Sequence, residues 1–154
     1  MKLSLIFTSI IVLLTSVHSE DESVGFDWQY DQPYNDLSTT VCGPYYLAQS
    51  PPTIAYNQIP NFPHIGAIPG ILGDNLADCG TCWLITYGEQ QLKLTAMDAS
   101  NSILISSDAM NALTGNQAES LGSVTADVVQ IDPSNCQVCK LPWMLTTLFF
   151  MPIF

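Results

Sequence analysis

Basic side chains are nearly missing from this 154-residue chain. Lysine and arginine together number 3 against 14 acidic residues, arginine is absent, and the formal net charge is −11. A surface of this sign repels phosphate backbones and anionic lipid headgroups, so neither nucleic acid nor specific membrane insertion is expected. Uncharged polysaccharides remain compatible with such a surface.

An apolar run long enough to span a bilayer is also lacking at the start of the chain. Residues 3–15 are mostly apolar, but a spanning helix needs about 20 such residues. The run follows Met1-Lys2 and ends in small residues up to Ser19, which is typical of a secretory signal peptide. We predict cleavage after Ser19, export to the extracellular space, and one domain in the remainder.

Histidine is scarce, which limits the catalytic possibilities. After the predicted cleavage only His64 remains, so Ser-His-Asp chemistry is not expected. Carboxylate chemistry stays open, because Asp98 ends a predicted strand and a glycosidase needs two carboxylates at a defined separation. The sequence alone leaves open whether Asp27, Asp31 or Asp127 lies opposite Asp98.

Short β-branched runs between turn-forming residues are typical of a secreted, mainly β domain. Residues 20–25 are polar and are expected to be a loose N-terminus, whereas aromatic rings alternate along residues 26–31 as on one face of a strand. Strands are expected at residues 26–31, 37–42, 83–87, 92–97, 103–105 and 124–131, with residues 83–97 forming a hairpin.

One helix is expected, over residues 106–115. A serine can cap its first N–H groups, Asp108 suits its positive end, and Gly115 can supply a left-handed stop. Prolines exclude a long helix in residues 43–73, while large apolar side chains there predict a loop that packs onto the core. These patterns together predict a small β-barrel or sandwich with one short helix.

The five cysteines centre on Cys79-Gly80-Thr81-Cys82, which precedes Trp83. Zinc is not expected, because this pair and the pair at residues 136 and 139 lie much farther apart than the roughly 15–20 residues of a zinc ribbon. A redox motif would need a helix after it, and a strand is predicted instead. In an exported chain we interpret the two cysteines as half-cystines with separate distant partners, and Trp83 as a core residue.

The last residues do not fit a β domain. Residues 140–154 are almost entirely apolar and contain two prolines. We interpret them as an extra packed strand, an exposed adhesive tail or a segment absent from the mature protein. Cys139 beside this tail is the cysteine left without a predicted partner.

Three ordered motifs resemble the cerato-platanin family, and the resemblance extends over residues 24–136. The segments that carry it are residues 58–66 (QIPNFPHIG), 78–83 (DCGTCW) and 96–98 (AMD), supported by residues 26–42, 109–114 and 134–136. The resemblance implies a six-stranded double-ψ β-barrel over residues 20–139, with one or two short helices. It also implies two disulfides, Cys42–Cys79 and Cys82–Cys136.

The family consists of small secreted fungal wall proteins that bind N-acetylglucosamine oligomers without a cofactor. They loosen polysaccharide in an expansin-like way without clear hydrolysis, elicit plant defence and self-assemble at interfaces. By resemblance the groove aspartate is Asp98 and the N-terminal aspartate is Asp27. Asn57 and Gln58 occupy the adjoining loop, and Ser100 lies in a loop after Asp98 that is shorter than the family's.

The leading hypothesis is therefore a non-catalytic sugar-binding protein that uses these five side chains, with a plant surface receptor as a further partner. One alternative is a barwin-like glycoside hydrolase that pairs Asp98 with a second carboxylate. Another is a surface-active protein that needs no ligand. The loop at residues 43–46 also departs from the family and borders the groove, which leaves the ligand preference open.

Overall fold

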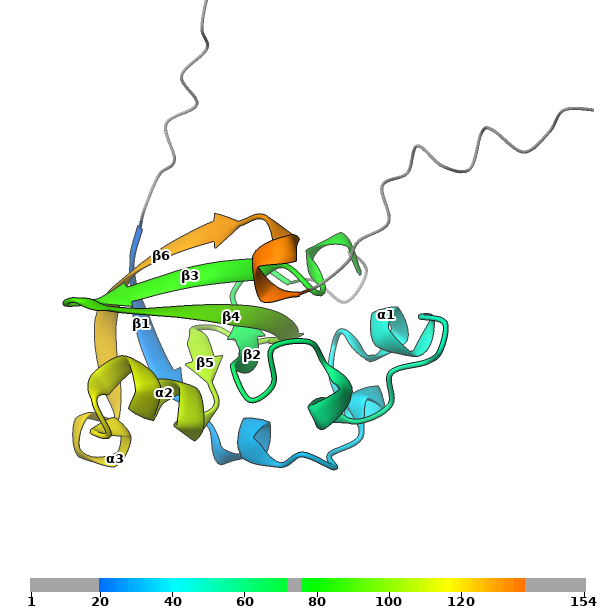
Figure 1. Ribbon diagram of the computed structural model, residues 1–154, viewed down its shortest axis with the longest axis horizontal. Helices are drawn as coiled ribbons and strands as arrows, with labels where there is room; N and C mark the ends of the chain where they lie inside the picture. The colour runs from blue at the N-terminus through cyan, green and yellow to red at the C-terminus, as the bar shows by residue number, and fades with distance from the viewer. Residues whose placement is uncertain (1–19, 72–75, 138–154) are drawn as a thin grey trace, which may run out of the picture.

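The computed structural model describes residues 20–71 and 76–137, which form a closed six-stranded barrel with short helices below it and to its right (Figure 1). The strand order is β1-β5-β2-β4-β3-β6, with β1–β5 and β2–β4 parallel and the other pairs antiparallel. The predicted signal peptide, Cys139 and the tail at residues 140–154 lie outside the described residues. The six-stranded barrel implied by the family resemblance is confirmed.

The strands are β1 (Glu20–Phe26), β2 (Ile65–Ile68), β3 (Cys82–Tyr87), β4 (Gln90–Ala99), β5 (Ile103–Ile105) and β6 (Ser123–Ile131). The α-helices are α1 (Gly43–Leu47), α2 (Ser107–Thr114) and α3 (Ala118–Leu121). Single turns of 3₁₀-helix lie at η1 (Trp28–Asp31), η2 (Leu37–Thr39), η3 (Tyr56–Gln58), η4 (Leu76–Asp78) and η5 (Pro133–Cys136). Among the residues described, none of the helices has the length and hydropathy needed to cross a membrane.

The predicted hairpin and helix are confirmed. β3 and β4 pair from Cys82↔Thr95 to Tyr87↔Gln90. Helix α2 begins after Ser106, whose hydroxyl accepts a hydrogen bond from the Ala109 N–H at 3.0 Å, and it ends at Gly115 with φ of 68°. A left-handed residue after the last turn costs least at glycine, so the sequence marks both ends of this helix.

The prediction that residues 43–73 pack onto the core is correct for the described residues 43–71, but this segment also contains elements that we did not predict. Pro44 lies in the first turn of α1, where its missing N–H costs nothing. β2 is fully buried between β4 and β5, and a Cβ atom at Gly66 would lie 2.2 Å from the Leu104 carbonyl oxygen. Only glycine allows such a close approach.

Two predicted strands are wrong. Residues 26–31 leave the sheet after Phe26, because Asp27 accepts the Gln29 N–H at 2.9 Å and caps η1. Trp28 is consequently 55% exposed and Tyr30 is 1% exposed, so their rings do not share a strand face. At residues 37–42, Asp36 caps η2 in the same way. Residues 20–25, expected to be loose, instead pair with β6 and belong to β1.

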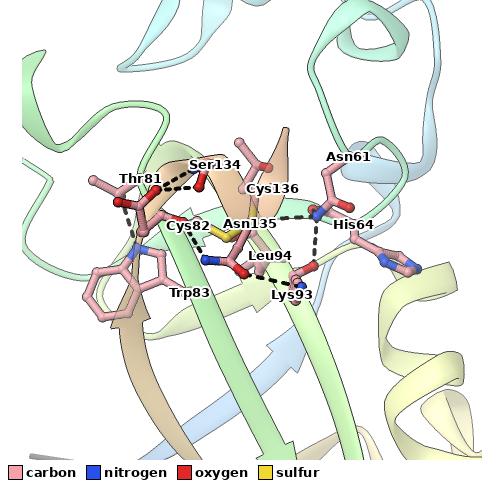
Figure 2. The surroundings of a disulfide bond; sticks show 12 residues. Asn61, His64, Thr81, Cys82, Trp83, Lys93, Leu94, Ser134, Asn135 and Cys136 are labelled. Atoms are coloured by element: carbon pink, nitrogen blue, oxygen red, sulfur yellow. Dashed lines mark hydrogen bonds between the residues drawn. A yellow bond between two sulfur atoms is a disulfide. The ribbon is translucent and has the colours of Figure 1, made fainter. Parts of the chain in front are cut away.

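The two disulfides are Cys42–Cys79 and Cys82–Cys136, as the family resemblance implied. Figure 2 shows the second bridge between β3 and the C-terminal turn η5. Beside it, the Trp83 indole N–H donates to the Thr81 hydroxyl at 3.0 Å. Trp83 is half-buried and packs against the core from one side, so the predicted core residue lies at the edge of the core.

Candidate functional site

Asp98 lies near the end of β4, where the chain turns away from the barrel toward β5. Its side chain is half-buried, so a ligand can reach it. One carboxylate oxygen, Oδ1, accepts the backbone N–H groups of Val41 and Ala99, each at 2.9 Å. The other, Oδ2, accepts the Tyr30 hydroxyl at 3.3 Å. All three neighbours donate to the carboxylate, so they fix its orientation and leave it an acceptor toward any ligand.

Two tyrosines form the floor beside Asp98. Tyr30 and Tyr56 are both buried, and their rings stack with centroids 6.4 Å apart. Burial raises the pKa of the Tyr30 hydroxyl well above its usual value, and the negative charge of Asp98 and the hydrogen bond to it raise the pKa further. Tyr30 therefore stays protonated and donates to Asp98 throughout the physiological pH range.

Asp27 and Asp36 belong to the same neighbourhood. Burial raises the pKa of Tyr56, a hydrogen bond with Thr39 partly offsets this, and the charges of Asp98, Asp27 and Asp36 raise it again. We call Asp27, Tyr30, Asp36, Tyr56 and Asp98 the Asp98 cluster. It includes Asp98, the groove aspartate of the family resemblance, and Asp27, the N-terminal aspartate of that resemblance.

A shallow hollow of about 410 Å³ adjoins this cluster and shares Asp36 with it. Its apolar lining is Tyr34, Leu47 and Ile54, of which Tyr34 is 84% exposed and Ile54 55% exposed. The hydrogen bond from the Leu37 N–H to the Ile54 carbonyl, at 3.0 Å, holds the two sides of the hollow together. An exposed ring beside carboxylates suits the flat face and hydroxyl groups of a sugar.

The other predicted sugar-binding residues lie in two loops. Asn57 and Gln58 belong to η3, directly after Tyr56. The Gln58 side-chain oxygen accepts the N–H groups of Ile54 and Ala55 at 2.8 and 3.2 Å, so this oxygen shapes the hollow. Asn57 is exposed. Ser100 follows β4 and donates to the Ser102 carbonyl within the β4–β5 turn.

Two other aspartates that could have opposed Asp98 are placed elsewhere. The Asp31 carboxylate accepts the N–H groups of Ser107 and Asp108 at 2.8 and 2.9 Å, and so caps the start of α2. Asp127 is exposed on β6, opposite Asp21 and Thr86. Neither contributes to the Asp98 cluster as described.

Sequence reasoning missed the donors that orient Asp98 and the role of Asp36. The Val41 N–H and the Tyr30 hydroxyl lie 57 and 68 positions from Asp98 in sequence, and no local pattern reports such a contact. The alternation at residues 26–31 favoured a strand and so misdirected the interpretation of Tyr30. The one available signal for Asp36 was its position before the Leu37-Ser38-Thr39 turn, where aspartate is a common cap.

The model of the family described as cerato-platanin matches residues 22–138, most of the chain. The chain belongs to the cerato-platanin family. It is 32% identical over 140 residues to the heat-stable 19 kDa antigen of Coccidioides posadasii, covering 87% of this chain and 94% of that protein. It is 34% identical over 117 residues to allergen Asp f 15 of Aspergillus fumigatus, covering 74% of this chain and 76% of the relative.

Solved cerato-platanin structures share its fold. Cerato-platanin 2 from M. perniciosa superposes with a TM-score of 0.70 at 28% identity, over 77% of this chain and all of that one. The solution structure of the fungal elicitor cerato-platanin gives a TM-score of 0.63 at 29% identity, over 74% and 95% of the two chains. The barrel and the cysteine pairing therefore belong to a family that includes a fungal elicitor.

Proposed function

We propose that this cerato-platanin is a secreted, non-catalytic wall protein that binds N-acetylglucosamine oligomers at the Asp98 cluster. The observation that carries the proposal is the oriented Asp98 carboxylate. Three of about four lone-pair directions on a carboxylate are taken by Val41, Ala99 and Tyr30, and one remains for a ligand. A sugar hydroxyl or acetamido N–H is a donor of the right kind.

The surrounding groups support a neutral glycan as the ligand. Asp27 adds a second carboxylate, and the exposed Tyr34 ring in the adjoining hollow offers a face for stacking. Asn57 and Ser100 contribute polar side chains at the two loops beside the cluster, and Gln58 keeps an amide N–H₂ for donation. Such a shallow site, with hydrogen bonds and one stacking ring, is suited to modest affinity and to a polymer that can slide past.

The test measures binding of N-acetylglucosamine oligomers to the secreted protein by calorimetry and retention on chitin. Asp98→Asn keeps an oxygen for the Val41 and Ala99 N–H groups but replaces the acceptor that faces the ligand, so we expect about tenfold weaker binding. Asp127→Asn, which removes the same charge on the exposed face of β6, is the matched control and should bind normally. No measurable binding by the unsubstituted protein would refute the proposal.

The two alternatives predict different outcomes when the same variants are tested in other assays. Release of new reducing ends that stops with Asp98→Asn would establish a hydrolase. Surface activity and plant response that survive Asp98→Asn would instead favour a role without a glycan ligand. We further propose expansin-like loosening of polysaccharide and recognition by a plant surface receptor, which predict that Asp98→Asn weakens polysaccharide loosening and the defence response together with binding.

A further inference from the structure

A second candidate site lies at one end of the barrel, where two glutamates occupy positions on the inner face of β1. In the pairing of β1 with β6, Glu20 lies opposite Val128 and Glu22 lies opposite Ala126. Directly opposed residues of an antiparallel pair share a face of the sheet, and Val128 and Ala126 are buried inside the barrel. At this end of the barrel Glu22 is half-buried and Glu20 is exposed, so both carboxylates are accessible from solvent.

The glutamates border an open groove of about 300 Å³. Its other walls include the half-buried Trp83 on β3, Ile103 on β5 and Gln130 on β6, which lies opposite Trp83. A smaller hollow of about 180 Å³ also lies against Trp83 and Gln130 and continues to Asp78. We call the two together the barrel-end groove. None of its lining residues belongs to the Asp98 cluster.

The groove combines negative charge with an aromatic wall. Apart from the α-amino group that the predicted cleavage leaves on Glu20, the described part of the chain supplies little positive charge to balance it. Within residues 20–71 and 76–137 the basic side chain is Lys93, and its ammonium group donates to Asn135 at 3.4 Å beside the Cys82–Cys136 bridge. Figure 2 shows Lys93 and the Trp83 ring on opposite sides of that bridge. This groove is complementary to a ligand that has a cationic group for the carboxylates and a ring that can pack against the Trp83 indole.

We propose that the barrel-end groove binds glucosamine units with free amino groups, as found in deacetylated chitin. The pyranose ring would lie against Trp83, and the ammonium group would face Glu20 and Glu22. Gln130 is placed to hydrogen-bond ring hydroxyls. A basic peptide would satisfy the same negative charges, and the trilysine control distinguishes it from a glucosamine oligomer.

The experiment titrates the secreted protein with glucosamine hexamer and, separately, with N-acetylglucosamine hexamer, following the Trp83 indole N–H by NMR. Both titrations are run at about pH 5.5, well below the pKa of ~7.7 of an ordinary amino group. Glu22→Gln should weaken glucosamine binding about two- to fivefold, the range of one partly exposed ion pair, and leave binding of the acetylated hexamer unchanged. Gln130→Glu should strengthen glucosamine binding by a similar factor.

The chain offers a close control in Asp21→Asn. Asp21 lies between the two glutamates in sequence but is exposed on the other face of β1, so it should not affect binding. Equal weakening by Asp21→Asn and Glu22→Gln, or equally tight groove binding of trilysine, would reduce the effect to general charge attraction and overturn the proposal. Loss of glucosamine binding with Asp98→Asn but not with Glu22→Gln would also overturn it. Failure of the acetylated hexamer to bind bears only on the Asp98 cluster.

Discussion

Replacement of Asp98 tests whether its hydrogen bonds hold the site together. Asp98→Ala leaves the backbone N–H of Val41 and the hydroxyl of Tyr30 without their acceptor, in a part-buried setting where Tyr30 is 1% exposed. Each unsatisfied buried donor costs about 1–3 kcal/mol. Water can reach this half-buried site and replace part of the lost bonding. We therefore expect the free energy of unfolding to fall by about 2–3 kcal/mol, a substantial part of the roughly 5–15 kcal/mol of an ordinary domain.

The Asp98→Asn variant removes the negative charge of the side chain but keeps one oxygen that can accept hydrogen bonds. The amide oxygen can still accept the Val41 and Ala99 N–H groups, and the Tyr30 hydroxyl can rotate to accept from the amide nitrogen. The expected loss is about 1 kcal/mol, since only charge assistance disappears. The Asn variant is therefore the one suited to ligand-binding tests.

The measurement is urea unfolding of the oxidised protein followed by circular dichroism, with the slope m compared between variants. Asp127→Ala, on the exposed surface of β6, should change stability by no more than about 0.5 kcal/mol. A loss for Asp98→Ala as small as that of Asp127→Ala would refute the anchoring role of Asp98. Equal losses for the Ala and Asn variants would refute the argument from acceptor geometry.

Two further predictions concern residues around the site. Asp31→Ala should lower the free energy of unfolding by about 1–3 kcal/mol, because this carboxylate caps two N–H groups at the positive end of α2; the same urea titration measures it, and Asp31→Asn should recover part of the loss. Burial raises the pKa of Tyr30 above that of an unfolded tyrosine, which is about 10. The free energy of unfolding should therefore decrease as the pH rises above about 10, by up to about 1.4 kcal/mol per pH unit. Tyr30→Phe should flatten this alkaline decline, and an unchanged slope would contradict the assignment.

The elements that the sequence predicted well are those whose signals are local. Helix α2 has its cap, Ser106, and its left-handed stop, Gly115, in its own segment. The β3–β4 hairpin likewise carries its turn at Gly88. The strand predicted at residues 26–31 was wrong because two local signals compete there. The alternating aromatic rings favour a strand, but the Asp27 side chain caps η1 and the chain forms a 3₁₀ turn. A single side chain-to-backbone hydrogen bond outweighed the periodicity.

The candidate site was predicted only in part. Asp98 can be recognised from its own sequence context, whereas its hydrogen-bond partners are distant in sequence. Asp98 could be singled out at the end of a strand, and the family resemblance added Asp27. The Val41 N–H that orients Asp98 belongs to a segment with no pattern of its own, after η2. β2 was missed for a related reason: a strand buried on both faces has no alternation, and its prolines on either side resemble a loop.

The Cys79–Cys82 segment explains how these distant parts are brought together. The N–H of Gly80 and the carbonyl of Thr81 pair with Ala96 of β4, each at 2.9 Å, two residues before Asp98. Cys79 is bonded to Cys42, the residue after Val41. The disulfide thus fixes the donor N–H of Val41 beside the strand that carries its acceptor. A motif that resembles a redox or metal site therefore has a structural role: it holds together the two halves of the Val41–Asp98 hydrogen bond, which are 57 positions apart in sequence.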